Sequence, residues 1–192
     1  RLRPARFGDF AILLRSVKTK AALYARELER AGIPVWTDVR GGFLDSVEIK
    51  TMLSLLQVIE NPLRDVPLLA VLLSPIFGFT ADEVAKMRLA DPQAGLYAIL
   101  VARRSEDARA SAFLQTLEQM RDAAAVLPCD RLIDRLFSMT GYDSAVQAME
   151  EGAERRANLL LLRDYARSYA GAGAQGLTGF LRYMNQLAEN GR

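Results

Sequence analysis

The segment from Asp9 to Pro62 constrains the fold most, because it alternates short apolar runs with amphipathic stretches. The apolar runs cover residues 10–14 and 34–37, and each has the length of a buried strand in a parallel sheet. The amphipathic stretches cover residues 19–31 and 47–59, where apolar side chains recur at near-helical spacing. The segment therefore predicts a strand, a helix, a second strand and a second helix, which is the order of a parallel α/β sheet.

Turn and capping residues bound these predicted elements. Gly32 follows the first helix in the position of a C-terminal cap, and Gly41-Gly42 predicts a turn. Asp45 and Glu48 have the spacing of a capping box at the start of the second helix. We expect that helix to end at Asn61-Pro62, because proline cannot continue it.

Arg15 follows the first predicted strand directly. Ligands of open α/β sheets bind outside the carboxyl ends of the strands. A guanidinium at that edge offers several donors to a phosphate. From its position alone, Arg15 is better explained as an ordinary surface residue, and an ion pair with a carboxylate that holds the strand end is the structural alternative.

Beyond Pro62 the sequence predicts helices only. Thr80 and Glu83 form a capping box, and this reading is favoured over a Walker B carboxylate pair because no apolar strand precedes Asp82-Glu83. The loop at residues 171–176 is rich in glycine and separates the last two helices. The expected helices cover residues 66–73, 81–89, 96–102, 108–126, 130–139, 143–149, 154–170 and 177–187.

Composition excludes several kinds of site. The 192 residues suffice for one good core or two small ones, and no apolar run reaches the roughly 18 residues of a membrane span. The single Cys129 excludes an internal disulfide, and the absence of histidine leaves little for a zinc site or a Ser-His pair. We therefore expect a cytoplasmic protein with no bound metal and no membrane partner.

The charge is unevenly distributed along the chain. Residues 1–40 hold nine Lys or Arg against four Asp or Glu, a net charge of +5, whereas the whole chain carries +2. An arginine-rich front end suits phosphate or nucleic acid, although a GC-rich genome produces the same bias.

Two blocks of sequence resemble a known family. ILLRS at 12–16, AGIPV at 31–35 and GGF at 41–43, with EIK and LSLLQVIENP at 48–62, resemble motifs IV and IVa of the superfamily 1 helicases related to UvrD, PcrA and RecB. NPLRDVPLLAVLLSPIFGF at 61–79 and GAERRANLLLLRDYARSYA at 152–170 are most similar to the AddA branch, the helicase–nuclease subunits of bacterial AddAB complexes. The chain is thus identified as a fragment of an AddA-like protein.

The resemblance implies a predominantly helical α/β fold with two parts. Residues 1–105 would belong to motor domain 2A and include a small parallel-sheet piece of a RecA-like fold. Residues 106–192 would form the all-helical accessory domain 2B. The implied function is ATP-dependent 3′–5′ unwinding and exonucleolytic resection of double-stranded DNA ends in break repair and homologous recombination, with ATP and Mg²⁺ as cofactors and AddB as partner.

The chain lacks most of the machinery that such an enzyme needs. No Gly-Lys pair occurs, so the phosphate-cradling Walker A loop is absent, and neither the later helicase motifs V and VI nor a nuclease domain is present. We expect this fragment alone to bind no cofactor and to be inactive.

The resemblance assigns roles to two places in the first part of the chain. By residue match, Arg15 is the motif IV arginine that reaches the γ-phosphate of ATP across the cleft between the motor domains. Gly78, Phe79 and Thr80 occupy the place of a Pro-x-Arg-Gly-Ile-Gly turn that touches the DNA backbone. Phe77 and Thr80 depart from that pattern, so a buried aromatic turn is the alternative.

Arg155 and Arg156 are candidates for contact with duplex DNA. Together with two later arginines they would form a basic stripe at helical intervals. Acidic residues lie among them, and a salt-bridged, solvated face is the favoured alternative. Glu48 and Lys50 fall in the motif IVa match, where we expect them to serve the helix start and packing.

Two other functions remain open. The chain also fits a UvrD- or PcrA-like repair helicase without a nuclease, which the domain downstream in the full-length gene would decide. A stand-alone helical interaction domain is the other possibility, and a first residue, Arg1, that is not methionine argues against it.

Overall fold

A computed structural model describes residues 3–15, 17–35, 43–171, 173 and 176–190. The described part is predominantly helical and contains no strand. None of its helices is both long and apolar enough to cross a bilayer. The elements, in chain order, are the 3-10 helix η1 (Phe7–Asp9) and the α-helices α1 (Val17–Arg30), α2 (Val47–Glu60), α3 (Asp65–Leu73), α4 (Ala81–Ala90), α5 (Leu96–Ala102), α6 (Ala108–Val126), α7 (Cys129–Thr140), α8 (Tyr142–Gln147), α9 (Gly152–Gly171) and α10 (Leu177–Asn190).

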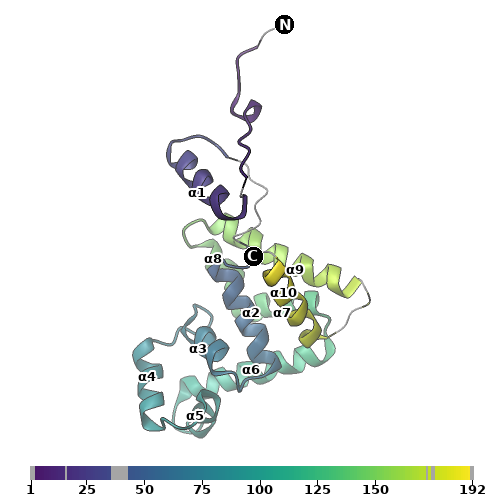
Figure 1. The fold of residues 1–192 in the computed structure, drawn as a ribbon. Coiled ribbons are helices and arrows are strands. Elements are labelled where there is room, and N and C mark those ends of the chain that lie inside the picture. The colour runs from purple at the N-terminus through teal and green to yellow at the C-terminus, as the bar shows by residue number, and fades with distance from the viewer. Residues whose placement is uncertain (1–2, 16, 36–42, 172, 174–175, 191–192) are drawn as a thin grey trace.

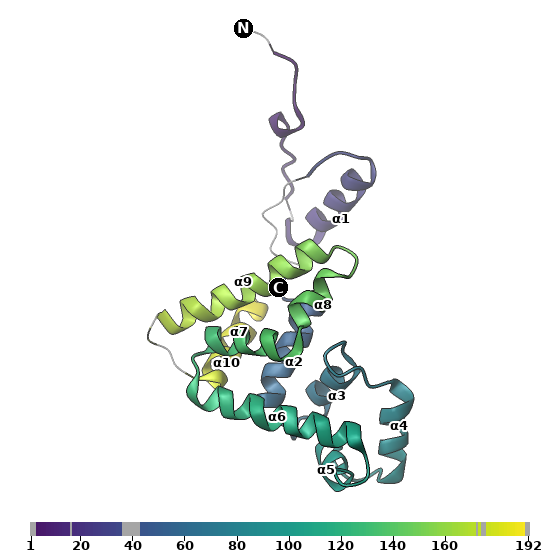
Figure 2. The same ribbon diagram turned by 180° about the vertical axis from the view of Figure 1, so that it is seen from behind.

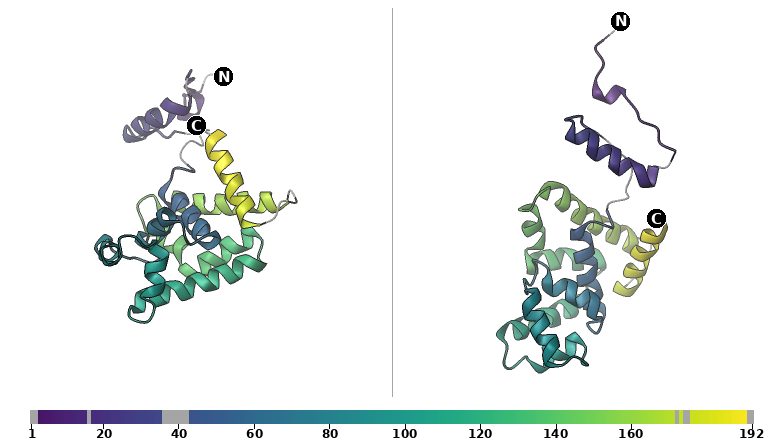
Figure 3. Two further views of the ribbon diagram at one scale, coloured as in Figure 1. Left: turned by 60° about the horizontal axis from the view of Figure 1, so that its bottom comes forward. Right: turned by 60° about the vertical axis from the view of Figure 1, so that its left-hand side comes forward.

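Helix α2 lies at the centre of the helical body. It packs against α3, α6, α9 and α10, and α6 runs along the body from α5 to α7 (Figures 1 and 2). The views of Figure 3 show residues 3–15 and α1 at one end, apart from the other helices.

One hydrophobic core unites α2 to α10. Apolar side chains of α2 such as Ile49 and Leu56 are buried in the same cluster as Leu117 of α6, Leu162 of α9 and Phe180 of α10. The core therefore crosses residue 105, the predicted boundary between the two domains, and that boundary stays a prediction.

The predicted parallel-sheet piece is not formed among the described residues. Phe10 has an extended backbone, with φ −103° and ψ 138°, but residues 10–14 pair with no other segment. Leu13 is 95% exposed. A strand needs a neighbour for its backbone hydrogen bonds, and of the second predicted strand residues 34–35 are irregular while 36–37 lie outside the described residues.

The predicted helices are all confirmed, with ends shifted by at most three residues. The C-terminal cap at Gly32 is confirmed as well: Gly32 has φ +74°, and the Ile33 amide donates to the Leu28 carbonyl at 3.0 Å. The Thr80 hydroxyl accepts from the Glu83 amide at 3.2 Å, while the Glu83 carboxylate accepts from the Thr80 amide at 2.7 Å. Both halves of the predicted capping box are thus present.

The capping box predicted for Asp45 and Glu48 is wrong. Helix α2 begins after Ser46, which is its N-cap residue. Glu48 is buried and its carboxylate binds side chains of α9. The Glu48 carboxylate, which a capping box would have used at the start of α2, instead binds Arg155 of α9.

Gly152 marks a close approach between α8 and α9. A Cβ atom at this position would lie 2.1 Å from the carbonyl oxygen of Gln147. Since backbone atoms cannot give way easily, Gly152→Ala should lower the free energy of unfolding by roughly 1–3 kcal/mol. Gly171→Ala is the matched control in the same helix, because its Cβ would meet nothing within 4 Å. Urea unfolding of the two variants compares these costs, and equal stabilities would show that the α8–α9 junction adjusts freely.

Candidate nucleotide and nucleic-acid contact sites

The predicted site residues lie on three separate elements. Arg15 precedes α1, residues 78–80 connect α3 to α4, and Arg155 and Arg156 lie in the first turn of α9. No hydrogen bond or ion pair of the described residues joins these places. The structure therefore does not assemble them into one site.

Arg15 lies at an exposed bend that follows residues 10–14, which form no regular element. No described carboxylate forms an ion pair with it. The alternative in which Arg15 is held by a carboxylate is therefore not formed among the described residues. Arg15 is exposed, as a contact to an external phosphate requires.

The turn between α3 and α4 is packed through its aromatic side chains. Gly78 has φ +62°, a conformation that favours glycine. Phe79 is only 5% exposed. The ring of Phe77 meets the edge of Phe113 of α6 at a centroid distance of 4.8 Å. These contacts are those of the alternative reading, a buried aromatic turn.

The backbone amides of this turn are already hydrogen-bonded. The amides of Phe77 and Gly78 donate to the Ser74 carbonyl at 3.2 and 2.8 Å. The Phe79 amide donates to the Leu72 carbonyl at 2.9 Å, and the Thr80 amide to the Glu83 carboxylate at 2.7 Å. A phosphate would have to displace these bonds to be held by the same amides. DNA contact through Gly78, Phe79 and Thr80 stays a prediction.

Arg109 of α6 binds this turn from outside, and the sequence analysis missed it. Its Nη2 donates to the carbonyls of Phe77 and Gly78 at 3.1 and 2.8 Å. Its guanidinium lies 4.3 Å from the ring centroid of Phe79, a cation–π contact, and it forms an ion pair with Glu83. No local pattern marks Arg109, because its partners lie about thirty residues earlier in the chain.

Glu83 is held ionised at this turn. Hydrogen bonds from the Thr80 amide and the Thr80 hydroxyl, joined by the bond from Arg109, keep the pKa of the Glu83 carboxyl below its ordinary value. The turn thus carries one carboxylate and one guanidinium side by side.

Arg155 is engaged in a buried ion pair with Glu48 of α2. Glu48 is 2% exposed. Its carboxylate accepts from Nη1 of Arg155 at 2.9 Å and from the side-chain amide of Asn158 at 2.8 Å. Burial raises the pKa of Glu48, but the bonds from Asn158, Ser46 and its own amide, with the Arg155 charge, outweigh burial and hold the pKa below its ordinary value. Glu48 therefore links α2 to α9 as an ion, as the packing interpretation of Glu48 predicted.

The other arginines of α9 also face carboxylates. Arg156 lies 4.0 Å from Asp143, Arg163 lies 3.6 Å from Asp134, and Arg167 lies 3.9 Å from Asp130. This is the salt-bridged face that the sequence analysis favoured over a basic stripe. DNA contact through Arg155 and Arg156 stays a prediction.

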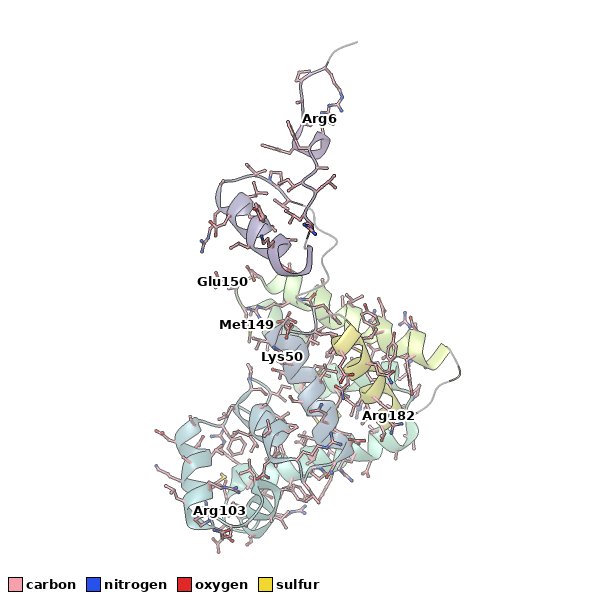
Figure 4. The ribbon with its side chains drawn as sticks, viewed as in Figure 1. Arg6, Lys50, Arg103, Met149, Glu150 and Arg182 are labelled. Carbon is pink, nitrogen blue, oxygen red and sulfur yellow. The ribbon has the colours of Figure 1, made fainter. Side chains whose placement is uncertain are left out.

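A recess of about 530 Å³ lies beside the Glu48–Arg155 pair. Phe43, Leu161 and Tyr165 contribute its apolar lining, and Glu151 and Glu154 are among its charged residues. Figure 4 labels the neighbouring Glu150 at this end of α9. The negative charge of these carboxylates opposes the approach of a phosphate backbone. Elsewhere too, no group of His, Cys, Asp and Glu in the described residues could hold a metal ion.

Comparison with known proteins identifies the family. The family model of the UvrD-like helicase C-terminal domain matches residues 3–183. The chain belongs to the UvrD-like helicase family. The match includes the N-terminal segment as well as the helical body, and it confirms the resemblance to helicases related to UvrD.

Among UvrD-like proteins, the chain is similar to several ATP-dependent helicase/nuclease subunits A. It is 42% identical over 189 residues to that of a Thermoanaerobacter species, which covers 96% of this chain and 15% of the relative. It is 43% identical over 190 residues to that of Acetivibrio thermocellus, again 96% of this chain and 15% of the relative. The predicted similarity to AddA, the helicase–nuclease subunit, is thereby confirmed. The chain spans about 15% of the length of these curated relatives.

Proposed function

We propose that the chain is part of a longer AddA-like protein, an ATP-dependent helicase and nuclease that unwinds and resects broken double-stranded DNA during homologous recombination. The observation that carries this proposal is the identity of 42–43% across nearly the whole chain to helicase/nuclease subunits A. The relatives' names favour this function over a repair helicase without a nuclease. The family match argues against a stand-alone interaction domain.

We assign the N-terminal segment to a motor domain and the helices to an accessory lobe. Phe10, Ile12 and Leu13 are exposed, and Phe10 has an extended backbone, as expected of a strand whose neighbours lie in the rest of the full-length protein. The packing of α2 against α9 and α10 supports a lobe that begins at α2. In this assignment the 2A–2B boundary lies near residue 43 rather than residue 105.

Arg15 is the residue of this chain that would contact ATP. It is exposed at the end of the proposed strand, and an arginine in this position stabilises the negative charge of the γ-phosphate during phosphoryl transfer. Carboxylates outside this chain would hold Mg²⁺, and the bound Mg²⁺ would neutralise charge on the phosphates. Because its sequence contains no Walker A loop, the chain by itself should be inactive.

DNA and a second subunit are the proposed partners. The lobe would guide duplex DNA toward the motor, and AddB would complete the complex. A chromosomal DNA substrate agrees with the cytoplasmic location predicted from the sequence.

The test compares the full-length protein with the 192-residue chain. With ATP and Mg²⁺, the full-length protein, alone and with AddB, should unwind duplex DNA with a single-stranded tail and then degrade it. The chain alone should show no ATP hydrolysis. Unwinding without degradation would support the helicase without a nuclease, and full-length protein that neither hydrolyses ATP nor unwinds DNA would support the interaction domain.

A further inference from the structure

Arg109 is the cation that organises the turn between α3 and α4. The N-cap residue Asp107 fixes the start of α6 by accepting from the amides of Arg109 and Ala110 at 2.9 and 3.1 Å. From this helix start the Arg109 side chain reaches over the turn and binds two of its carbonyls, the ring of Phe79 and the Glu83 carboxylate. Four contacts of three kinds thus fix one guanidinium at the turn.

The fixed guanidinium still has donors to offer. An arginine carries five N–H donors, and three of those in Arg109 are bound to Phe77, Gly78 and Glu83. The Nε–H and one Nη1–H donate to no described residue. The side chain is 45% exposed, so an external acceptor can reach it.

The turn itself has little else to bind an anion. The amides from Phe77 to Thr80 are all hydrogen-bonded within the turn or to the adjoining helices, and the Ile76 amide donates to the Ser74 hydroxyl at 3.3 Å. An arginine that is already held in place and has donors left over can bind a phosphate oxygen. Charge-assisted hydrogen bonds to phosphate are strong, and the planar guanidinium matches the geometry of the phosphate oxygens. We propose that Arg109 is the residue through which this turn contacts a phosphate of the DNA backbone. The inference rests on the proposed function, namely that the full-length protein binds DNA.

A substitution at Glu83 tests the proposal by a gain of DNA affinity instead of a loss. Its carboxylate is paired with Arg109 and repels an approaching phosphate. Glutamine retains the oxygen that caps α4, since Glu and Gln both complete a capping box, but it removes the negative charge. If Arg109 binds phosphate, Glu83→Gln must strengthen DNA binding.

The experiment measures DNA affinity of the full-length protein as a function of KCl concentration. The probe is a fluorescently labelled duplex with a single-stranded tail, and binding is followed by anisotropy without ATP. Arg109→Met should weaken binding roughly tenfold and reduce the slope of log affinity against log salt by about 1. Arg109→Lys should restore most of the slope, because it keeps one charge on the phosphate. Glu83→Gln should tighten binding about threefold, as expected from removing one repulsive charge at the contact.

Arg104→Met is the matched control. The Arg104 side chain is 48% exposed and pairs with Glu118 of α6 but with no other described carboxylate, so its loss should leave affinity and salt slope unchanged. Melting temperatures of all variants report folding separately.

Two results would overturn the proposal while leaving the proposed function in place. One is an unchanged salt slope in Arg109→Met when wild-type protein binds DNA. The other is unchanged or weaker DNA binding in Glu83→Gln. If Arg109→Met does not fold, the Glu83→Gln result alone tests the proposal. Wild-type protein that does not bind DNA at all would instead contradict the proposed function.

Discussion

Arg15→Ala should lower DNA-stimulated ATP turnover of the full-length protein at least about tenfold, which is about 1.4 kcal/mol of transition-state stabilisation. The reason is electrostatic: an arginine that reaches the γ-phosphate stabilises charge that develops only as the phosphoryl group leaves. Nucleotide binding should survive the substitution, because in the proposed full-length helicase a Walker A loop outside this chain would hold the other phosphates. Steady-state ATP hydrolysis and a nucleotide-binding titration measure the two quantities side by side.

Arg6→Ala is the control for Arg15→Ala. Arg6 lies in the same N-terminal segment (Figure 4) and is also exposed, but it precedes the proposed strand. Its loss should leave turnover unchanged. Equal turnover in wild type and Arg15→Ala would show that Arg15 is structural, and the motif IV match would no longer support its assignment to the ATP site.

Arg155→Ala should destabilise the helical body by about 3–5 kcal/mol, because it leaves the buried carboxylate of Glu48 without its charged partner. Arg156→Ala is the matched control one residue later. Its side chain is 44% exposed and its Nε lies 4.0 Å from the Asp143 carboxylate, so its loss should cost about 1 kcal/mol or less. Urea unfolding at pH 7 separates the two, and equal midpoints would show that the Glu48–Arg155 pair does not hold α2 to α9.

The same pair predicts a dependence of stability on pH. Because the pKa of Glu48 is lower in the folded chain than in the unfolded chain, its contribution is complete above the unfolded value, near 4.5. The contribution is lost as pH falls through the lower folded value. Glu48→Gln should therefore flatten the stability profile in the acid range and leave its shape above about pH 5 unchanged. A variant that keeps the wild-type acid profile would contradict this assignment.

The helices were predictable because their signals are local. Apolar spacing and capping residues placed α5 and α6 at their observed bounds, Leu96–Ala102 and Ala108–Val126. A helix satisfies its hydrogen bonds within one segment, so a local pattern suffices. The predicted strand at residues 10–14 depends on partners elsewhere, and the described residues supply none.

For the candidate sites too, local features were predicted from the sequence, whereas contacts between distant residues were not. The chemistry of Arg15 was predicted from its position after an apolar run, together with a family resemblance. A salt-bridged Arg155 was also expected, but its partner was not, because Glu48 lies 107 residues away. Arg109 was missed for the same reason, since its partners in the α3–α4 turn are also distant in sequence.

The sequence by itself determined the order of the helices, most of their ends, the uneven charge and the family, because periodicity, caps and motifs are properties of neighbouring residues. Only the tertiary structure decided which arginines are bound and which remain available. Arg155 is held by a buried carboxylate, whereas Arg109 sits on a turn with two donors free. The physical reason is that a guanidinium binds whichever acceptor the fold brings within reach, and that distance is set by packing between helices remote in the chain.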